Sequence, residues 1–487
     1  MHIRPTTLDL EAFWQSHQRF LHCTLTTETP HPDTHDLSHL ACTDLAQALD
    51  ILQTIDLAVL QRLKLHLHTV HALKAAFNQT WQQQGRVFIL GCGASGRMAV
   101  CLENAWRAAH QTEQVVGVIA GGDFALVRSI EQFEDQPELG IRQLQQQGFG
   151  PQDLLIATSA SGESPFVLAA VEYAQQLCQA KPWLLYCNPN TQLHTRNPEH
   201  LSTSTGIAPW CLDVGPMALT GSTRMQATTA MQMALGLALL ADDPALCLTQ
   251  CEQALHAVNF TQLIPFIEME SRQPLPAWRY AAEAKLALTV LTDLTERTPT
   301  FNIAPLYNDV LDANNTAPYA FEVLDTHNRQ HAWQCLRQTK PYQLDWPAFQ
   351  QTTPETLLGF DFHATQQPEQ VNMTTQNWQL NIANKANITW SFDWPELPEF
   401  SQQIQHKILL NTLSTLVMGR LGYYSGNLMT HVQPTNHKLF DRTIRYVQYR
   451  YQQRHHTTLD YATAADRILH AWPQLQPGES LVEQCSF

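Results

Sequence analysis

Five short apolar segments alternate with longer segments of helical character between residues 83 and 245. The apolar segments are VFIL at 87–90, VVGVIA at 115–120, LLIAT at 154–158, WLLYC at 183–187 and WCLDV at 210–214. Such alternation is typical of a parallel sheet with both faces covered, because each connecting helix packs on one face. The pattern predicts an α/β domain built on a five-stranded parallel sheet flanked by helices.

The rest of the chain contains a helical segment before this domain and a second α/β pass after it. Apolar residues of the first segment recur at helical spacing, at Leu45, Leu49, Leu52, Ile55, Val59 and Leu63. A proline-containing link, ESRQPLPAW, precedes the second pass, which begins at Trp278 and is less regular. The predicted divisions are a helical segment at 1–82, a first α/β domain at 83–245, a linker at 246–276, a second α/β domain at 277–430 and a C-terminal helical region at 431–487.

Composition excludes several classes of protein. The 29 basic and 44 acidic residues give a net charge of −15, whereas nucleic-acid binding needs a basic face. The N-terminus has no signal-peptide pattern and no apolar stretch is long enough to span a membrane, so we expect a cytoplasmic protein. The cysteines form no CxxC pairs and the histidines are scattered, so we expect no disulfide framework, metal or cofactor.

The strongest chemical signal is GCGASGR at 91–97, between the first apolar segment and a helical segment. Glycines let the backbone approach an anion closely, and a helix N-terminus presents N–H groups that bind phosphate. Gly93, Ala94, Ser95 and Gly96 are therefore candidate phosphate-binding residues. No Lys-Ser/Thr pair follows, so this is not a P-loop, and the residues alone would also suit a structural turn or a dinucleotide site.

Two further loops carry hydroxyl groups after apolar segments. The loop TSASGESP at 158–165 supplies the candidates Ser159, Ser161, Gly162 and Ser164, and LTGSTR at 219–224 adds Ser222. Clustered hydroxyls suit a phosphate or a sugar better than a nicotinamide cofactor, although N-caps that only begin a helix have the same composition. Because the ends of parallel strands share one edge, the loops define one crevice. A carboxylate at Glu163 is unfavourable beside a phosphate unless it faces away or contacts a sugar hydroxyl.

These motifs resemble the sugar isomerase (SIS) domain of the N-acetylmuramic acid 6-phosphate etherases and of the glucokinase regulatory protein. The resemblance rests on GCGASGRM, IAGGDFALVRSIEQFED, SASGESPFVLAAVEYA and LTGSTRMQATTAMQMAL, and on the C-terminal ILLNTLSTLVMGRLGYYSGNLMTHVQPTNHKLFDRTIRYV. The N-terminal TETPHPDTHDLSHL is also similar. The resemblance covers about residues 26–240 and 277–450. It implies two tandem SIS domains, each a flavodoxin-like three-layer sandwich, with a C-terminal helical lid.

The second half resembles the first without its phosphate loop. TAMQMALGLALLA and KILLNTLSTLVMG occupy corresponding places, each after its own α/β pass, which indicates a duplication. RYAAEAKLALTVL stands where a second phosphate loop belongs, with Leu286 and Leu288 in place of its serine and arginine. We therefore expect one phosphate site in the chain.

The resemblance also implies two catalytic carboxylates. Glu134 matches one glutamate of the etherases, while the position of the other is Ala105 in the first domain. The segment DLTERTPTF of the second domain provides Glu296 instead, so domains packed like dimer subunits would form one composite site. The lid lysine Lys438 would pair with the phosphate, with Arg442 one turn later. From the residues alone, a solvated helix face for Glu134 and a surface ion pair for Glu296 are the favoured interpretations, and the resemblance reverses this preference.

Two functions follow from the resemblance. The first is an etherase-type lyase that releases lactate from N-acetylmuramic acid 6-phosphate. The second is a non-catalytic sensor that binds a phosphorylated hexose or amino sugar and controls a sugar kinase, as the glucokinase regulatory protein does. A ketose/aldose isomerase is a third class, less well matched by the motifs.

Overall fold

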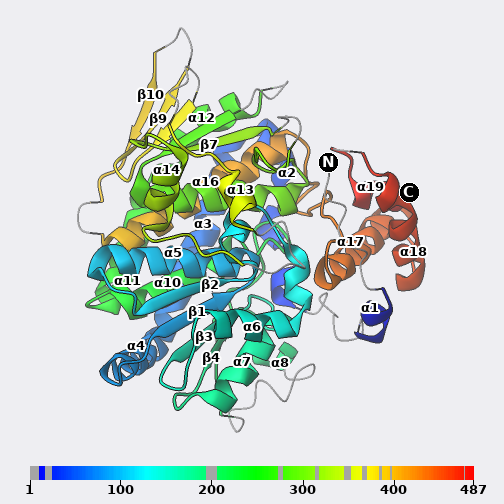
Figure 1. Cartoon of the computed structure of the whole chain (residues 1–487). Coiled ribbons are helices and arrows are strands. Elements are labelled where there is room, and N and C mark those ends of the chain that lie inside the picture. The colour runs from blue at the N-terminus through cyan, green and yellow to red at the C-terminus, as the bar shows by residue number, and fades with distance from the viewer. Residues whose placement is uncertain are drawn as a thin grey trace.

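The computed structural model of the chain describes residues 10–16, 25–193, 206–272, 278–312, 317–344, 353–364, 370–382, 386–394, 397–476 and 478–487. These residues form two α/β halves with helices packed between the sheets, and a group of C-terminal helices lies to one side (Figure 1). The predicted α/β class with two sheets and a helical C-terminal region is confirmed.

The first sheet has five parallel strands in the order β2-β1-β3-β4-β5, as in the flavodoxin-like fold. The strands are β1 (Val87–Gly91), β2 (Val115–Ile119), β3 (Leu154–Thr158), β4 (Trp183–Tyr186) and β5 (Ala208–Cys211). The predicted sheet is therefore confirmed. β5 begins and ends earlier than predicted. It ends before Asp213, whose positive φ of 41° an extended strand does not accommodate.

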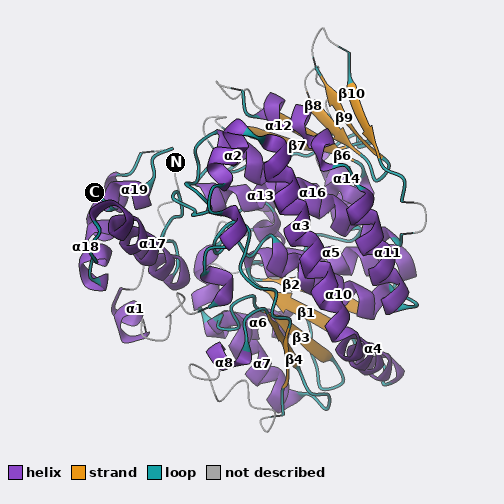
Figure 2. Ribbon diagram, turned by 180° about the vertical axis from the view of Figure 1, so that it is seen from behind, coloured by secondary structure: helices purple, strands orange, loops and turns teal. Residues whose placement is uncertain are grey.

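Helices cover both faces of this sheet. α5 packs against β1, β2 and α10, whereas α6 and α7 pack together, with α7 on β3. Figure 2 shows α5 and α10 on one side of the strands and α6 and α7 on the other. The helices of this half are α5 (Gly93–His110), α6 (Pro137–Gln146), α7 (Pro165–Leu177), α8 (Asn190–Leu193) and α10 (Gln226–Leu240).

The second sheet is mixed, with strand order β10-β9-β8-β6-β7. Its strands are β6 (Trp278–Ala282), β7 (Tyr319–Val323), β8 (Gln370–Met373), β9 (Asn377–Asn381) and β10 (Ile388–Ser391). β6 is parallel to β7 and β8, but β9 is antiparallel to β8 and β10. The expected parallel arrangement fails for β9 because residues 374–376 are too few for a crossover connection.

The remaining helices precede, join and follow the two halves. The N-terminal ones are α1 (Leu10–Ser16), α2 (Leu37–Thr43), α3 (Leu45–Leu63) and α4 (Leu67–Gln82). The second half contributes α13 (Ala284–Phe301), α14 (Arg329–Arg337), α15 (Pro354–Leu358) and α16 (Glu399–Arg420), and the C-terminal helices are α17 (His437–His455), α18 (Tyr461–Ala471) and α19 (Leu481–Cys485). The segment predicted as a linker holds most of α11 (Pro244–Ala257) and all of α12 (Ile264–Glu270), and its residues 273–276 lie outside the described residues.

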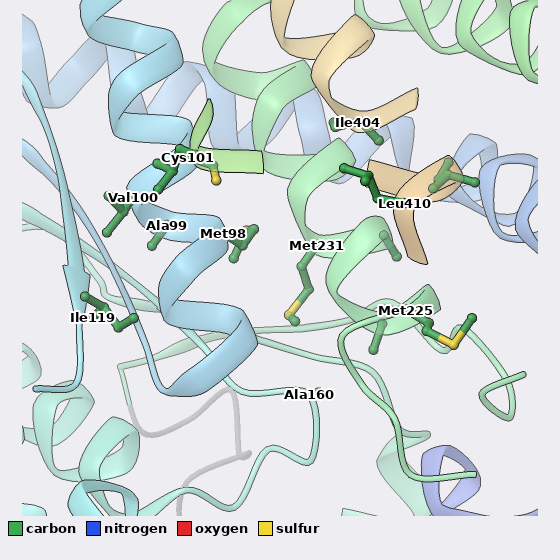
Figure 3. Close-up of a cluster of buried hydrophobic side chains, with 14 of the residues drawn as sticks. Met98, Ala99, Val100, Cys101, Ile119, Ala160, Met225, Met231, Ile404 and Leu410 are labelled. Carbon is green, nitrogen blue, oxygen red and sulfur yellow. The ribbon is translucent and has the colours of Figure 1, made fainter. Parts of the chain in front are cut away.

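One hydrophobic core joins the two halves. Met98 of α5, Met231 of α10, and Ile404 and Leu410 of α16, the long helix of the second half, belong to one cluster of buried hydrophobic side chains (Figure 3). α10 and α16 are buried along nearly their whole length because each is packed between other helices. The corresponding apolar helices of the duplicated pattern thus form the contact between the halves.

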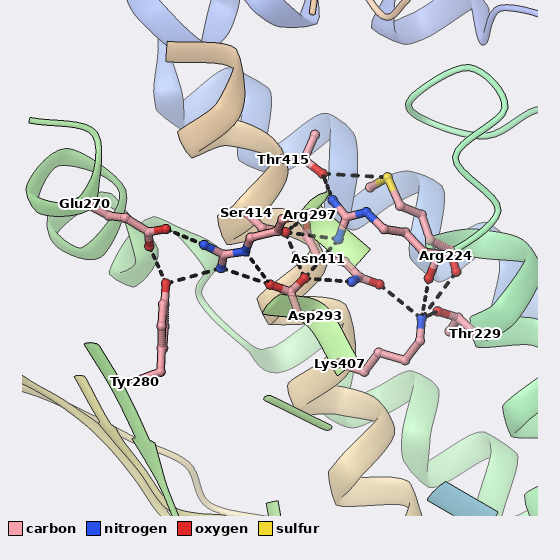
Figure 4. Close-up of polar contacts among 11 residues, drawn as sticks. Arg224, Thr229, Glu270, Tyr280, Asp293, Arg297, Lys407, Asn411, Ser414 and Thr415 are labelled. Atoms are coloured by element: carbon pink, nitrogen blue, oxygen red, sulfur yellow. Dashed lines mark hydrogen bonds and ion pairs between the residues drawn. The ribbon is translucent and has the colours of Figure 1, made fainter. Parts of the chain in front are cut away.

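A buried polar network crosses the same contact (Figure 4). Asp293 of α13 accepts hydrogen bonds from Nη1 of Arg224 and from Nε of Arg297, each at 2.9 Å. Burial raises the pKa of Asp293, but the two guanidinium groups outweigh burial, and the pKa is lowered overall. Further members of the network are Glu270, Tyr280, Lys407, Asn411, Ser414 and Thr415.

Asp56 of α3 is a buried carboxylate, and its ionisation is expected to make the stability of the protein depend on pH. It is buried, accepts a hydrogen bond from Nε2 of Gln226 at 2.8 Å, and has a pKa raised to about 7, chiefly by burial. A raised folded-state pKa means that the stability from the protonated form is present below pH 4 and is lost as the pH rises to 7. We therefore expect Asp56→Asn to raise the free energy of unfolding at pH 8 by roughly 2–4 kcal/mol, and to change it little at pH 4.

Chemical unfolding at both pH values measures this difference. Asp50→Asn, at an exposed position of the same helix, is the matched control and should change the free energy of unfolding equally little at each pH. A difference between wild type and Asp56→Asn that stays constant with pH would contradict the expectation.

Candidate functional site

A cleft lies where three loops of the first half meet α13 and α17. Its first wall is the N-terminus of α5, where Gly93, Ala94 and Ser95 follow the end of β1. The first N–H groups of a helix have no partner within it and favour an anion in front of them. Gly96 does not line the cleft, because a Cβ there would lie 2.5 Å from the backbone O of Gly91. It allows α5 to pack closely against the sheet.

The second wall is the loop after β3. Ser159, Ser161 and Ser164 line the cleft, and the Oγ atoms of the first two lie 3.4 Å apart. Gly162 is not part of the lining. It has a φ of +78°, and its N–H donates to Oγ of Ser159 at 3.1 Å, so it forms the turn that brings the hydroxyl groups together.

The third wall is the loop before α10. Ser222 lines the cleft, and its buried Oγ has no hydrogen-bond partner among the residues that the structure describes. A buried hydroxyl without a partner is costly, so this atom is suited to a ligand. Thr223 and Arg224 of the same loop also line the cleft, and Arg224 pairs with Asp293 behind it.

The two predicted carboxylates face this same cleft from different halves. Glu134 lies in the 3-10 helix Glu131–Asp135 and accepts hydrogen bonds from Nζ of Lys438 at 2.6 Å and Nδ2 of Asn436 at 3.1 Å. Glu296 lies in α13 and is ion-paired with Arg97 of α5. All the predicted site residues except Gly96 and Gly162 therefore line one cleft, in the composite arrangement predicted from the resemblance.

α17 closes the cleft with two cations. Lys438 pairs with Glu134. Burial lowers the pKa of Lys438, but the charge of Glu134 raises it, and the pKa is raised overall. Arg442, one turn later, binds both carboxylate oxygens of Glu28, with Nε at 2.8 Å and Nη2 at 2.6 Å. Burial raises the pKa of Asp135 to about 6, although His437, whose N–H donates to it at 2.9 Å, lowers the pKa.

Sequence reasoning missed Glu28 as a residue of the cleft. Its only signal was its place in TETPHPDTHDLSHL, the N-terminal part of the resemblance. Gly221 lies against the Glu28–Arg442 pair, and a Cβ there would come within 2.8 Å of Glu28 Oε2. Glycine is therefore required where the third loop meets the pair. Cys92, Glu131 and Thr300 also line the cleft and were not predicted.

The charges of the cleft are largely paired. Lys438, Arg442 and Arg224 each form an ion pair with a carboxylate, while the helix N-terminus and the serine hydroxyls carry no charge. Neutral donors are thus the principal groups with which this cleft can bind an anion, as in phosphate sites at helix N-termini. The described residues contain no group of three or more His, Cys, Asp or Glu side chains suited to a metal ion.

The corresponding place in the second half is filled. Leu286 and Leu288, near the start of α13, are buried, and Oε1 of Glu283 accepts the N–H of Thr375 at 2.6 Å. Apolar side chains and a carboxylate at this helix start disfavour a phosphate. Within the described part of the chain, the combination of a glycine loop, clustered hydroxyl groups and an open helix N-terminus therefore occurs in the first half alone.

The strand order and the hydroxyl-lined crevice at a helix N-terminus define a SIS-domain protein. The family described as glucokinase regulatory protein N-terminal SIS domain matches residues 68–175. The N-acetylmuramic acid 6-phosphate etherases of Erwinia tasmaniensis and Aliivibrio fischeri are 35% and 33% identical over 216 and 217 residues, which is 44% of this chain and 66% and 68% of theirs. The chain belongs to the N-acetylmuramic acid 6-phosphate etherase family.

Solved structures give a more distant likeness. The tagatose-6-phosphate ketose/aldose isomerase of Escherichia coli is 16% identical, with a TM-score of 0.34 over 56% of this chain and 67% of that protein.

The described helices include none that is long and apolar enough to cross a membrane.

Proposed function

We propose that the chain is an etherase-type lyase that acts on N-acetylmuramic acid 6-phosphate at one composite site. The observation that carries the proposal is that Glu134 and Glu296, from different halves, line the same cleft as the hydroxyl-rich loops. The etherase names of relatives 33–35% identical support it. In this proposal the 6-phosphate binds the N–H groups of α5 and the loop serines, which places the sugar between the two carboxylates.

The proposed reaction needs one base and one acid. Glu296 removes the proton from C2 of the open-chain aldehyde, where the carbonyl acidifies it. The C3–O bond then breaks, and the Glu134–Lys438 pair supplies the proton that D-lactate carries away. Water adds its hydroxyl to C3 and its proton to C2, which gives N-acetylglucosamine 6-phosphate. Each half of the chain thus contributes one functional carboxylate.

Incubation of the purified protein with N-acetylmuramic acid 6-phosphate tests the proposal directly. We expect D-lactate to be released by the wild type and not by a variant carrying both Glu134→Gln and Glu296→Gln. Binding of the sugar phosphate without release of D-lactate by the wild type would refute the lyase function.

Lys438→Ala tests the contact between the lid and the ligand by a binding measurement. Lys438 lines the cleft, and a charge-assisted hydrogen bond to a ligand contributes about 1.5–3 kcal/mol. We therefore expect the Kd for N-acetylglucosamine 6-phosphate, measured by titration calorimetry, to rise roughly 10- to 100-fold. Lys181→Ala, at an exposed position, is the control. An unchanged Kd in Lys438→Ala would show that Lys438 does not contact the bound sugar phosphate.

A second candidate function is a sugar-phosphate-responsive regulator of a sugar kinase. The match of residues 68–175 to the glucokinase regulatory protein N-terminal SIS domain favours this candidate. It predicts that the protein changes the activity of a sugar kinase and that a hexose phosphate modulates the effect. Unchanged kinase activity with and without hexose phosphates would count against the regulator.

A further inference from the structure

Among the described residues, Glu296 is ion-paired with Arg97 of α5. Nη1 of Arg97 donates to Oε1 of Glu296 across the contact between α5 and α13. The Arg97 side chain is fully buried, and Glu296 is 7% exposed, at the edge of the cleft. The contact therefore joins a buried cation of one half to a cleft-facing carboxylate of the other.

Arg97 also lies beside the second carboxylate. A small cavity behind the cleft is lined by Arg97, Cys92, Glu131 and Glu134. Nε of Arg97 has no hydrogen-bond partner among the described residues. A buried guanidinium with an unused N–H donor is costly, and this donor is available to a further partner.

The corresponding positions of the two halves strengthen this point. Counted from the first residue of each helix, Arg97 of α5 corresponds to Leu288 of α13. By the same count, Glu296 of α13 corresponds to Ala105 of α5. Arg97 thus lies in the half whose glycine loop is intact. The positions that correspond to Arg97 and Glu296 are Leu288 and Ala105, which are apolar. A pair required only to join the halves has no reason to occur at the cleft in particular.

We propose that Arg97 is a positioning residue that holds Glu296 as an oriented carboxylate, with Oε1 bound and Oε2 left to the substrate. This inference rests on the proposed lyase function. The ion pair with a buried guanidinium fixes the direction of the carboxylate, as a base at C2 requires. Other charged groups near Glu296 are Asp293, Arg224, Lys407, Glu134 and Lys438.

Three variants test the role. Arg97→Met removes the charge but keeps an apolar stem, and Arg97→Lys restores a charge without the planar fork. Arg337→Met is the matched control, because Arg337 of α14 pairs with Glu103 and Asp123 across the same halves and does not line the cleft. D-lactate release is measured as kcat and KM from pH 5 to 9, with chemical unfolding in parallel.

We expect Arg97→Met to lower kcat roughly 100-fold with KM changed less than about threefold. Arg97→Lys should recover part of kcat. Arg337→Met should lose stability but keep the wild-type kcat profile. If Arg97→Met does not fold, Arg97→Lys carries the test, with a reduced kcat and a KM close to that of the wild type expected.

Two results overturn the inference, and they are distinguishable. Active wild type, with Arg97 variants whose profile matches that of Arg337→Met, refutes the positioning role and leaves the lyase function intact. Wild type that binds N-acetylmuramic acid 6-phosphate and releases no D-lactate refutes both.

Discussion

Glu296→Gln is expected to lower the kcat for D-lactate release by roughly 10²–10⁴-fold, because glutamine cannot accept the C2 proton. Glutamine keeps the size of the side chain and can accept the hydrogen bond from Arg97, so the fold should persist. The phosphate loops belong to the other half of the chain, so the Kd for N-acetylglucosamine 6-phosphate should change by less than about threefold. The measurement is a D-lactate assay beside calorimetric titration.

Glu138→Gln, at an exposed position of α6, is the control and should leave both quantities unchanged. Retention of more than about a tenth of the wild-type kcat by Glu296→Gln would exclude Glu296 as the base. In that case the composite site would hold a sugar phosphate without using the carboxylate of the second half.

Asp293→Ala is expected to lower the free energy of unfolding by about 3–5 kcal/mol. The change leaves Arg224 and Arg297 buried without the carboxylate between them, and removes the acceptor of hydrogen bonds from Asn411 and Ser414 at 3.1 and 2.8 Å. Removing one partner of a buried network exposes the full desolvation cost of the others. Chemical unfolding measures the loss.

Asp50→Ala, at an exposed position of α3, serves as the reference and should change the free energy of unfolding by less than about 0.5 kcal/mol. Asp293→Asn should lie between the two, because an amide oxygen still accepts one hydrogen bond. A loss below about 1 kcal/mol in Asp293→Ala would mean that the network does not stabilise the contact between the halves.

Much of the site was predictable from local sequence. The three loops could be predicted because an apolar strand, a glycine, hydroxyl-bearing residues and a helix follow one another within a few residues. The resemblance added Glu134, Glu296 and Lys438. Glu28 was missed because nothing near it in the chain marks it as a partner of Arg442. Gly96 and Gly162 were assigned to the ligand because a glycine that approaches a phosphate and one that approaches a helix or forms a turn look alike in sequence.

The sequence by itself determined the first sheet, the hydroxyl-rich loops and the loss of the second phosphate loop, since these depend on residues close together in the chain. The tertiary structure alone decided which charges meet. Arg97 and Glu296 are 199 residues apart, Lys438 and Glu134 are 304 apart, and Arg442 and Glu28 are 414 apart. Periodicity and turn chemistry act over a few residues, whereas an ion pair depends on how whole helices pack, and the packing of α5, α13 and α17 is what turns scattered charges into one site.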